Sequence, residues 1–168
     1  MKNKGDRHKL TSFQVIILGF IAVILIGALL LMLPVSSREG RITSFSDALF
    51  TSTSAVCVTG LVVRDTASYW SAFGQAVLLI LIQIGGLGVV SVASFAVMLS
   101  GKKISLSQRQ TLQNAVSAPN VGGILRLLGF IFKGSFIVEA IGALLLLPVF
   151  IPKLGPKGIW YSVFHSIS

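Results

Sequence analysis

Long runs of apolar residues alternate with short polar stretches along this chain. Three of these runs, over residues 13–33, 76–99 and 125–151, carry almost no charge. A helix rises ~1.5 Å per residue, so even the run over 13–33 would extend ~31 Å and cross a hydrocarbon core of ~30 Å. We therefore predict three transmembrane helices over these ranges, the first of them ended by Pro34.

A shorter apolar stretch lies between the first two predicted spans. Ser44, followed three residues later by Asp47, is typical of a helix start, because the hydroxyl caps the helix and the carboxylate suits its first turn. The predicted helix over 45–54 would be only ~15 Å long and cannot span a membrane. Residues 55–63 are uncharged and rich in β-branched side chains, which predicts an extended segment.

This layout is that of a re-entrant pore loop, with the helix over 45–54 as its pore helix. Non-helical backbone lies at membrane depth only where it is buried in protein or lines a water-filled cavity. Its carbonyl oxygens can then replace the water shell of an ion. The candidate selectivity filter comprises Ala55, Val56, Cys57, Val58, Thr59 and Gly60.

The roles of several residues in and beside this loop have two interpretations. Gly60 is either a filter glycine that needs positive φ or a plain turn glycine. Ser54 and Thr53 either support the loop or bond to their own helix. Asp47 either attracts cations or caps the helix, and Cys57 is expected to be a small packed side chain.

Two further features fall inside the other spans. Gly85, Gly86 and Gly88 allow close helix packing or mark a flexible point near a pore. Glu139 lies within the third span, where a carboxylate is costly and a functional role is the default hypothesis. It either binds an ion or makes a buried structural hydrogen bond. Lys133 faces another side of the helix, so we expect the partner of Glu139 to lie elsewhere, for example in repeats outside this chain.

Composition supports an all-α integral membrane protein. Hydrophobic residues make up 54% of the 168, charged residues 11%, and the mean hydropathy is +0.88, whereas soluble domains carry about 25% charged residues. The net charge of +9 resides in the tails and loops, which indicates membrane topology and no nucleic-acid partner. The single cysteine excludes an internal disulfide. The isolated His8 and His165 form no catalytic or metal-binding group, so no enzyme activity is expected.

The basic residues also predict orientation. They are more frequent in the tail over 1–12 and in the connection over 100–124 than around the loop, which places the N-terminus in the cytoplasm of a multi-pass cell-membrane protein. The connection contacts either a regulatory partner or anionic membrane lipid. The residues concerned are Lys2, Lys4, Arg7 and Lys9 in the tail and Lys102, Lys103, Arg109 and Arg126 after the second span.

An internal repeat is visible at an offset of 114 residues. Leu-Pro-Val recurs at the end of the first and third spans, and a phenylalanine and two serines recur further on. The matching positions include Pro34 and Pro148, Phe50 and Phe164, Ser52 and Ser166, and Ser54 and Ser168. Residues 13–99 thus form a first span–pore–span repeat, and 125–168 begin a second, with a short helix over 159–168. We expect the chain to be a piece of a longer protein that stops before the second filter.

Three stretches resemble the Trk/Ktr/HKT superfamily of cation transporters, and in particular the bacterial Ktr-type potassium uptake membrane subunit. They are residues 51–61 (TSTSAVCVTGL), 83–88 (QIGGLG) and 160–168. The resemblance implies four span–pore–span repeats in one polypeptide, arranged like the subunits of a potassium channel. It makes Gly60 the filter glycine, with the carbonyls of 55–59 along the ion path.

The same resemblance implies the ions and the partners. Potassium would be the transported ion, often with sodium as a coupling or stimulating ion, and this chain itself would hold no cofactor. A homodimer on a cytoplasmic nucleotide-binding ring of the RCK/KTN type is implied. The loop has one glycine where potassium channels have two, as is usual in the superfamily.

Two other functions compete with this interpretation. A small homotetrameric cation channel is disfavoured by the third span and the repeat. A non-conducting membrane anchor subunit of a larger complex has no need of the uncharged segment over 55–61.

Overall fold

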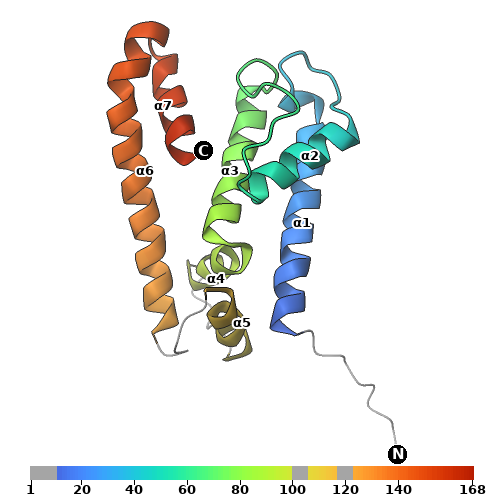
Figure 1. Ribbon diagram of the computed structural model, residues 1–168, viewed down its shortest axis with the longest axis vertical. Coiled ribbons are helices and arrows are strands. Elements are labelled where there is room, and N and C mark those ends of the chain that lie inside the picture. Colours follow the sequence, from blue (N-terminus) through green and yellow to red (C-terminus); the bar gives the residue numbers. More distant parts are fainter. Residues whose placement is uncertain (1–10, 100–105, 117–122) are drawn as a thin grey trace, which may run out of the picture.

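The computed structural model describes residues 11–99, 106–116 and 123–168, and these are helical apart from the turns and loops between helices (Figure 1). The predicted all-α fold is confirmed for this part of the chain, where the only strand-like pairing is one bridge between Ser37 and Trp70. Predictions for residues 1–10, 100–105 and 117–122 lie outside the described residues. The elements are α1 (Ser12–Met32), the 3-10 turn η1 (Pro34–Ser36), α2 (Phe45–Val56), α3 (Ala72–Leu87), α4 (Val89–Leu99), α5 (Leu106–Val116), α6 (Ile124–Leu154) and α7 (Lys157–Ile167).

Helices α1, α3 and α6 run along the long axis of the molecule, while α2 crosses obliquely beside α1 and α3 (Figure 1). Helix α1 starts at a capping box, in which Thr11 and Gln14 exchange backbone-to-side-chain hydrogen bonds of 2.9 and 3.3 Å. Within the described ranges, two helices are long and apolar enough to cross a membrane, α1 and the stretch Leu125–Leu154 of α6. Both coincide with predicted spans.

The second predicted span is not one continuous helix. The prediction of a single helix over 76–99 is wrong, because α3 ends at Leu87 and α4 starts at Val89. Gly88 between them has φ of +83°, a conformation that costs glycine little and other residues more. Hydropathy does not detect such a break. Helix α3 also begins earlier than predicted, because the Ser71 hydroxyl caps it by accepting the Gly74 N–H (3.2 Å).

Helix α6 is longer than the predicted span over 125–151. It contains Pro148 and Pro152 and continues to Leu154, so the predicted end of this span at residue 151 is wrong. Prolines are tolerated in apolar helices where neighbouring groups satisfy the freed backbone. The chain reverses instead at Gly155, whose φ is +58°, and α7 then packs back along α6.

Close packing of α1, α2 and α3 forms the main core around the fully buried Trp70 and Leu31. A second, smaller core joins α4, α5 and α6 through Leu112, Leu128 and Phe132. Helix α5 lies in the connection predicted over 100–124 and packs against α1 as well as α4.

The same serine contact occurs in the α1–α2 pair and in the α6–α7 pair. Ser52 on α2 donates its hydroxyl to the Ile24 carbonyl of α1 (2.8 Å), and a Cβ on Gly27 would meet that hydroxyl oxygen at 2.5 Å. Ser166 on α7 donates to the Glu139 carbonyl of α6 (2.6 Å), and a Cβ on Gly142 would collide with that hydroxyl. The two serines are 114 residues apart, and their acceptors and glycines 115. Helix α2 therefore packs against α1, and α7 against α6, through one serine hydroxyl in contact with one glycine of the longer helix.

Candidate functional site: the loop after helix α2

Helix α2 extends two residues beyond the predicted end at 54. Ala55 and Val56 are helical and buried, so the prediction that the extended segment starts at 55 is wrong. The reason is tertiary packing. The Val56 carbonyl lies so close to Gly85 of α3 that a Cβ on this glycine would collide with it. Burial against α3 thus favours a helical turn where the β-branched pattern predicted extended chain.

The loop over residues 57–63 leaves this helix through a tight reversal, and its first residue, Cys57, is exposed, so the prediction of a packed side chain there is wrong. Val58 has φ of +53° and is the only non-glycine residue with positive φ in the described parts of the chain. Gly60 has φ of +70°, and a Cβ there would meet nothing within 4 Å. The dihedral angle, and not a lack of space, is what favours glycine at this position. Positive φ at a β-branched residue is strained, and such strain is concentrated at functional sites.

Four consecutive carbonyl oxygens of this loop are unpaired. Among the described residues, no hydrogen bond is donated to the backbone oxygens of Cys57, Val58, Thr59 and Gly60. On the C-terminal side, the Leu61 carbonyl accepts the Ser54 hydroxyl (2.7 Å). On the N-terminal side, the Val56 carbonyl also accepts no hydrogen bond from the described residues, but it is packed against Gly85 of α3. Backbone carbonyls need a partner such as protein, water or a cation. This row can therefore serve as a set of cation ligands.

Ser54 fixes the loop from behind. Its hydroxyl, on a side chain that is 7% exposed, donates to the Leu61 carbonyl (2.7 Å) and lies 3.0 Å from the Thr59 hydroxyl. Thr53 instead donates to the Leu49 carbonyl of its own helix (2.7 Å). The two readings left open by the sequence thus separate, with Ser54 contacting the loop and Thr53 bonding locally.

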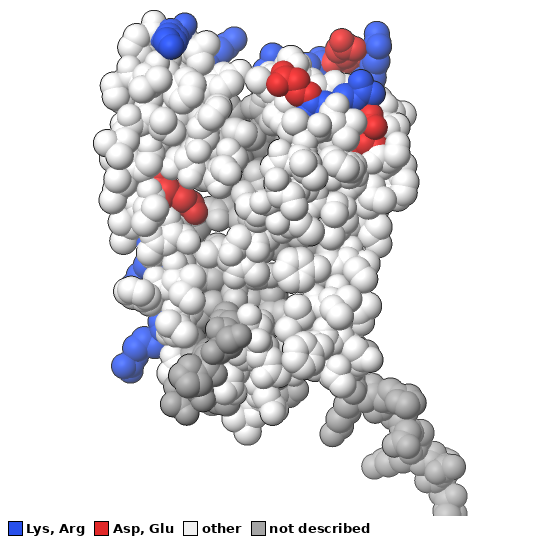
Figure 2. Space-filling model, in the orientation of Figure 1, with Lys and Arg blue, Asp and Glu red and all other residues white. Residues whose placement is uncertain are grey.

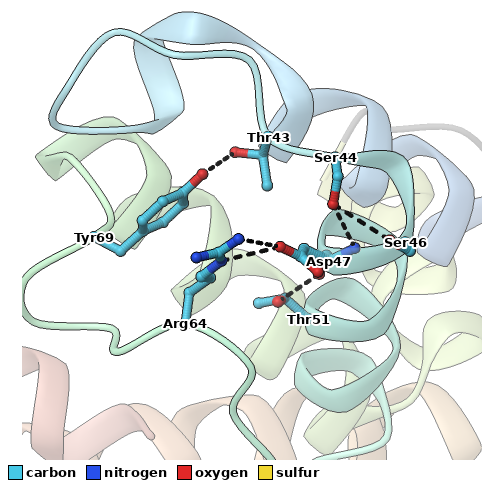
Figure 3. Close-up of polar contacts among 7 residues, drawn as sticks. All are labelled: Thr43, Ser44, Ser46, Asp47, Thr51, Arg64 and Tyr69. Atoms are coloured by element: carbon cyan, nitrogen blue, oxygen red, sulfur yellow. Dashed lines mark hydrogen bonds and ion pairs between the residues drawn. The ribbon is translucent and has the colours of Figure 1, made fainter.

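The C-terminal end of the loop is joined to the start of α2 by an ion pair (Figure 3). Arg64 places Nε 3.0 Å and Nη2 2.9 Å from Asp47 Oδ2. Its guanidinium lies 5.4 Å from the centre of the Tyr69 ring, and the Tyr69 hydroxyl is 3.0 Å from Thr43 Oγ1. Ser44 caps α2 by accepting the Asp47 N–H (3.3 Å). The Asp47 charge is therefore largely compensated, which sequence reasoning missed because it did not link Arg64 to this helix.

A turn follows the ion pair and carries one perturbed carboxylate. The hydroxyl and the N–H of Ser68 both donate to Asp65 and lower the pKa of its carboxyl, with a smaller contribution from Arg38. Asp65 thus remains ionised at neutral pH on the surface of the protein.

A cavity of about 320 Å³ separates the loop from α7. Thr59 and Gly60 line one side, Leu78 and Ile82 of α3 the middle, and Phe164 of α7 the far side. The loop therefore faces a space shared by the α1–α3 unit and the α6–α7 unit.

Glu139 is hydrogen-bonded to a residue other than Lys133, as expected, and this partner lies within the described chain. Gln83 of α3 donates its Nε2–H to Glu139 Oε2 over 2.6 Å. No sequence pattern indicates this pair, because the partner is neutral and 56 residues away. Lys133, also on α6, is exposed. No group of three or more His, Cys, Asp and Glu side chains suited to a metal is found in the described ranges.

Of the three glycines in the second predicted span, only one serves close packing. Gly85 is in contact with Val56, Gly86 has open space around it, and Gly88 provides the break between α3 and α4. The packing interpretation thus applies to Gly85, whereas a flexible point near a pore stays a prediction.

Comparison with known proteins agrees with the resemblance found in the sequence. The family model TrkH, described as a cation transport protein, matches residues 2–168, and the chain belongs to this family. It is 45% identical over 166 residues to the potassium/sodium uptake protein NtpJ of Enterococcus hirae, covering 98% of this chain and 37% of the relative.

The Ktr system potassium uptake protein B of Bacillus subtilis is 45% identical over 161 residues, 95% of this chain and 36% of that protein. The protein of the same name from Vibrio alginolyticus is 38% identical over 166 residues, 98% of this chain and 36% of that protein. The chain therefore spans a little over a third of the length of these relatives.

Proposed function

We propose that this chain forms part of a potassium uptake protein in the cell membrane, in which loop 57–63 contributes to the cation path. The observation that carries the proposal is the row of four carbonyls from Cys57 to Gly60 that are unpaired among the described residues, between the buried C-terminal half of α2 and a cavity of about 320 Å³. Carbonyl oxygens at such a constriction replace the hydration shell of a cation. The names of the relatives, two potassium uptake proteins and one potassium/sodium uptake protein, support potassium as the ion and sodium as a second candidate.

The structure refines which residues we assign to this path. Ala55 and Val56 were expected to present carbonyls, but both lie within α2 and the Val56 carbonyl packs against Gly85. We therefore restrict the proposed cation ligands to the four residues from Cys57 to Gly60. Helix α2 directs its C-terminal, partially negative end toward them, which favours a cation.

The repeat supports a pore built from several such units. The α1–α2 and α6–α7 pairs share the serine-over-glycine contact described above, and α7 lies across the cavity from the loop. We propose that α7 is the pore helix of a second unit and that further units of the whole protein complete the path. A cytoplasmic N-terminus, a homodimer and a nucleotide-binding ring partner are part of this proposal, and the words "Ktr system" in the names of the relatives are consistent with additional subunits.

The test is cation uptake by cells that lack their own potassium transporters, using the full-length protein with its ring partner. The wild type should restore growth at low potassium. Gly60→Ser should reduce the preference for potassium over sodium, because serine resists positive φ and so displaces the neighbouring carbonyls.

Gly40→Ser is a matched control. Gly40 also has positive φ, +67°, and no atom within 4 Å of an added Cβ, but it lies in the turn after α1. Unchanged selectivity in Gly60→Ser, or an equal loss in Gly40→Ser, would remove loop 57–63 from the cation path. No rescue by wild-type protein that is present in the membrane would favour a non-conducting anchor.

A further inference from the structure

A groove of about 540 Å³ opens at the end of the molecule that carries the α6–α7 turn. It lies where the α1–α3 unit meets the start of α7. Trp160 of α7 donates its indole N–H to Gln75 Oε1 of α3 (2.7 Å), and this bond joins the two sides. The lining residues are Ser37, Arg38, Ser71, Ala72, Gln75, Lys157, Trp160 and Tyr161.

Both charged residues of the lining are basic, and both are available to a ligand. Arg38 and Lys157 are exposed and make no ion pair within the described parts of the chain. By contrast, Arg41 and Arg64 at the same end each pair with a carboxylate. Figure 2 shows basic side chains on both sides of this end of the molecule, over the α6–α7 turn and over the loops beside α1 and α3. The groove lining therefore carries two positive charges without an ion pair, of which that of Arg38 is partly offset by the nearby Asp65 carboxylate.

The two cations are held in different ways. Arg38 is anchored by a hydrogen bond from Nε to the Trp70 carbonyl (3.2 Å), which leaves its terminal N–H groups for a ligand. Lys157 occupies the first turn of α7, a helix with no acidic residue in that turn and no side-chain cap. The partial positive charge of the helix N-terminus adds to that of the lysine. Together these groups favour an anionic ligand.

Aromatic and apolar side chains next to the cations indicate a lipid. Trp160 is 37% exposed and Tyr161 lines the groove beside it, and such amphipathic rings prefer the headgroup level of a membrane. Phe73, adjacent to Ala72 of the lining, and Ile80 one heptad later are 42% and 59% exposed on α3. These side chains offer an apolar surface to acyl chains below a headgroup.

We propose that this groove binds the headgroup of an anionic phospholipid, with the phosphate between Arg38 and Lys157 and the glycerol region against Trp160. The site is distinct from the proposed cation path. The lipid-site proposal rests on the proposed function only in that the chain spans a bilayer. Lipid binding at the groove can therefore be absent while cation transport is retained.

The test is native mass spectrometry of the full-length protein in detergent with phosphatidylglycerol or phosphatidylcholine added. We expect phosphatidylglycerol to bind more tightly than phosphatidylcholine. Arg38→Gln and Lys157→Gln should each weaken phosphatidylglycerol binding about fivefold, as expected for one cation near a phosphate. Lys157→Arg should retain binding, which distinguishes loss of charge from a local structural defect.

Lys153→Gln is the matched control. Lys153 lies in the last turn of α6, at the same end of the molecule, but does not line the groove. An equal loss in this control would show diffuse attraction to anionic lipid and overturn the site. So would equal binding of the two lipids, or displacement of phosphatidylglycerol by inorganic phosphate at equal concentration, which would identify a site for soluble anions.

Discussion

Gln83 of α3 and Glu139 of α6 are joined by a hydrogen bond of 2.6 Å. Glu139 also provides, through its backbone carbonyl, the acceptor for Ser166 of α7 (2.6 Å). One residue of α6 thus contacts the α1–α3 unit with its side chain and α7 with its backbone. Together with the Trp160–Gln75 bond (2.7 Å), these bonds connect α3 to both α6 and α7, in addition to the packing of α4 and α5 against α6.

Removing the Glu139 carboxylate should destabilise the protein through its partner. Glu139→Leu leaves the Gln83 amide without its acceptor, and the expected cost is about 1–3 kcal/mol in the free energy of unfolding. Glu139→Gln keeps an acceptor oxygen and should cost less. Thermal denaturation of the full-length protein in detergent measures both variants.

The double variant Gln83→Leu with Glu139→Leu provides the control. It leaves no unpaired amide and should recover part of the lost stability. If Glu139→Gln is as harmful as Glu139→Leu, the charge of Glu139 has a role beyond Gln83, and an ion-binding role becomes the better interpretation.

Gly85→Ala should destabilise the packing of α3 against the end of α2. The added methyl group would collide with the Val56 carbonyl, and such overpacking costs about 1–3 kcal/mol. Gly86→Ala is the matched control, because its Cβ meets open space and alanine favours a helix by up to ~1 kcal/mol. Denaturation midpoints should therefore move in opposite directions, and equal shifts would contradict the observed contact.

Breaking the Arg64–Asp47 ion pair should shift the C-terminal end of the loop over 57–63. Arg64 is 51% exposed and Asp47 19%, so the effect on stability is small, up to about 1 kcal/mol. On the proposed function, Arg64→Gln and Asp47→Asn should both lower the preference for potassium over sodium, because each breaks the same ion pair and so releases the end of the loop from α2. Cation uptake ratios measure this effect.

The two substitutions change the net charge in opposite directions. If only the electrostatic potential at the outer mouth matters, Arg64→Gln should raise cation uptake and Asp47→Asn should lower it. A positioning contact instead predicts that the double variant is no worse than either single one. Arg41→Gln, at the exposed Glu39–Arg41 pair, should leave the ratio unchanged.

Ser54→Ala should alter the loop, whereas Thr53→Ala should not. The Ser54 hydroxyl donates a hydrogen bond to the Leu61 carbonyl and contacts the Thr59 hydroxyl. Loss of these contacts should make residues 57–60, which carry the unpaired carbonyls, more mobile. Thr53 bonds only to Leu49 within its own helix. On the proposed function, selectivity falls in the first variant and is retained in the second. An equal effect of the two in cation uptake would contradict a supporting role for Ser54.

Hydropathy and capping patterns were sufficient for the helices that depend on local sequence. The start of α2 at Phe45 follows from Ser44 as a cap, and the extent of α1 follows from its apolar run and Pro34. The same patterns predicted the wrong helix boundaries at Val56, at Gly88 and at Pro152. In the first case burial against another helix decided the conformation, and in the other two a glycine set the helix end where hydropathy showed no boundary.

The sequence by itself determined that this is an all-α protein with apolar spans, a short helix between two of them and an uncharged loop with one glycine. These properties are encoded by residues close together in the chain, through hydrophobic length, capping and the freedom of glycine. Only the tertiary structure decided which carbonyls of the loop are unpaired, that Arg64 compensates Asp47 and that Gln83 is the partner of Glu139. Each of these depends on groups brought together from distant segments, since a hydrogen bond or an ion pair between helices leaves no periodic signal in the sequence.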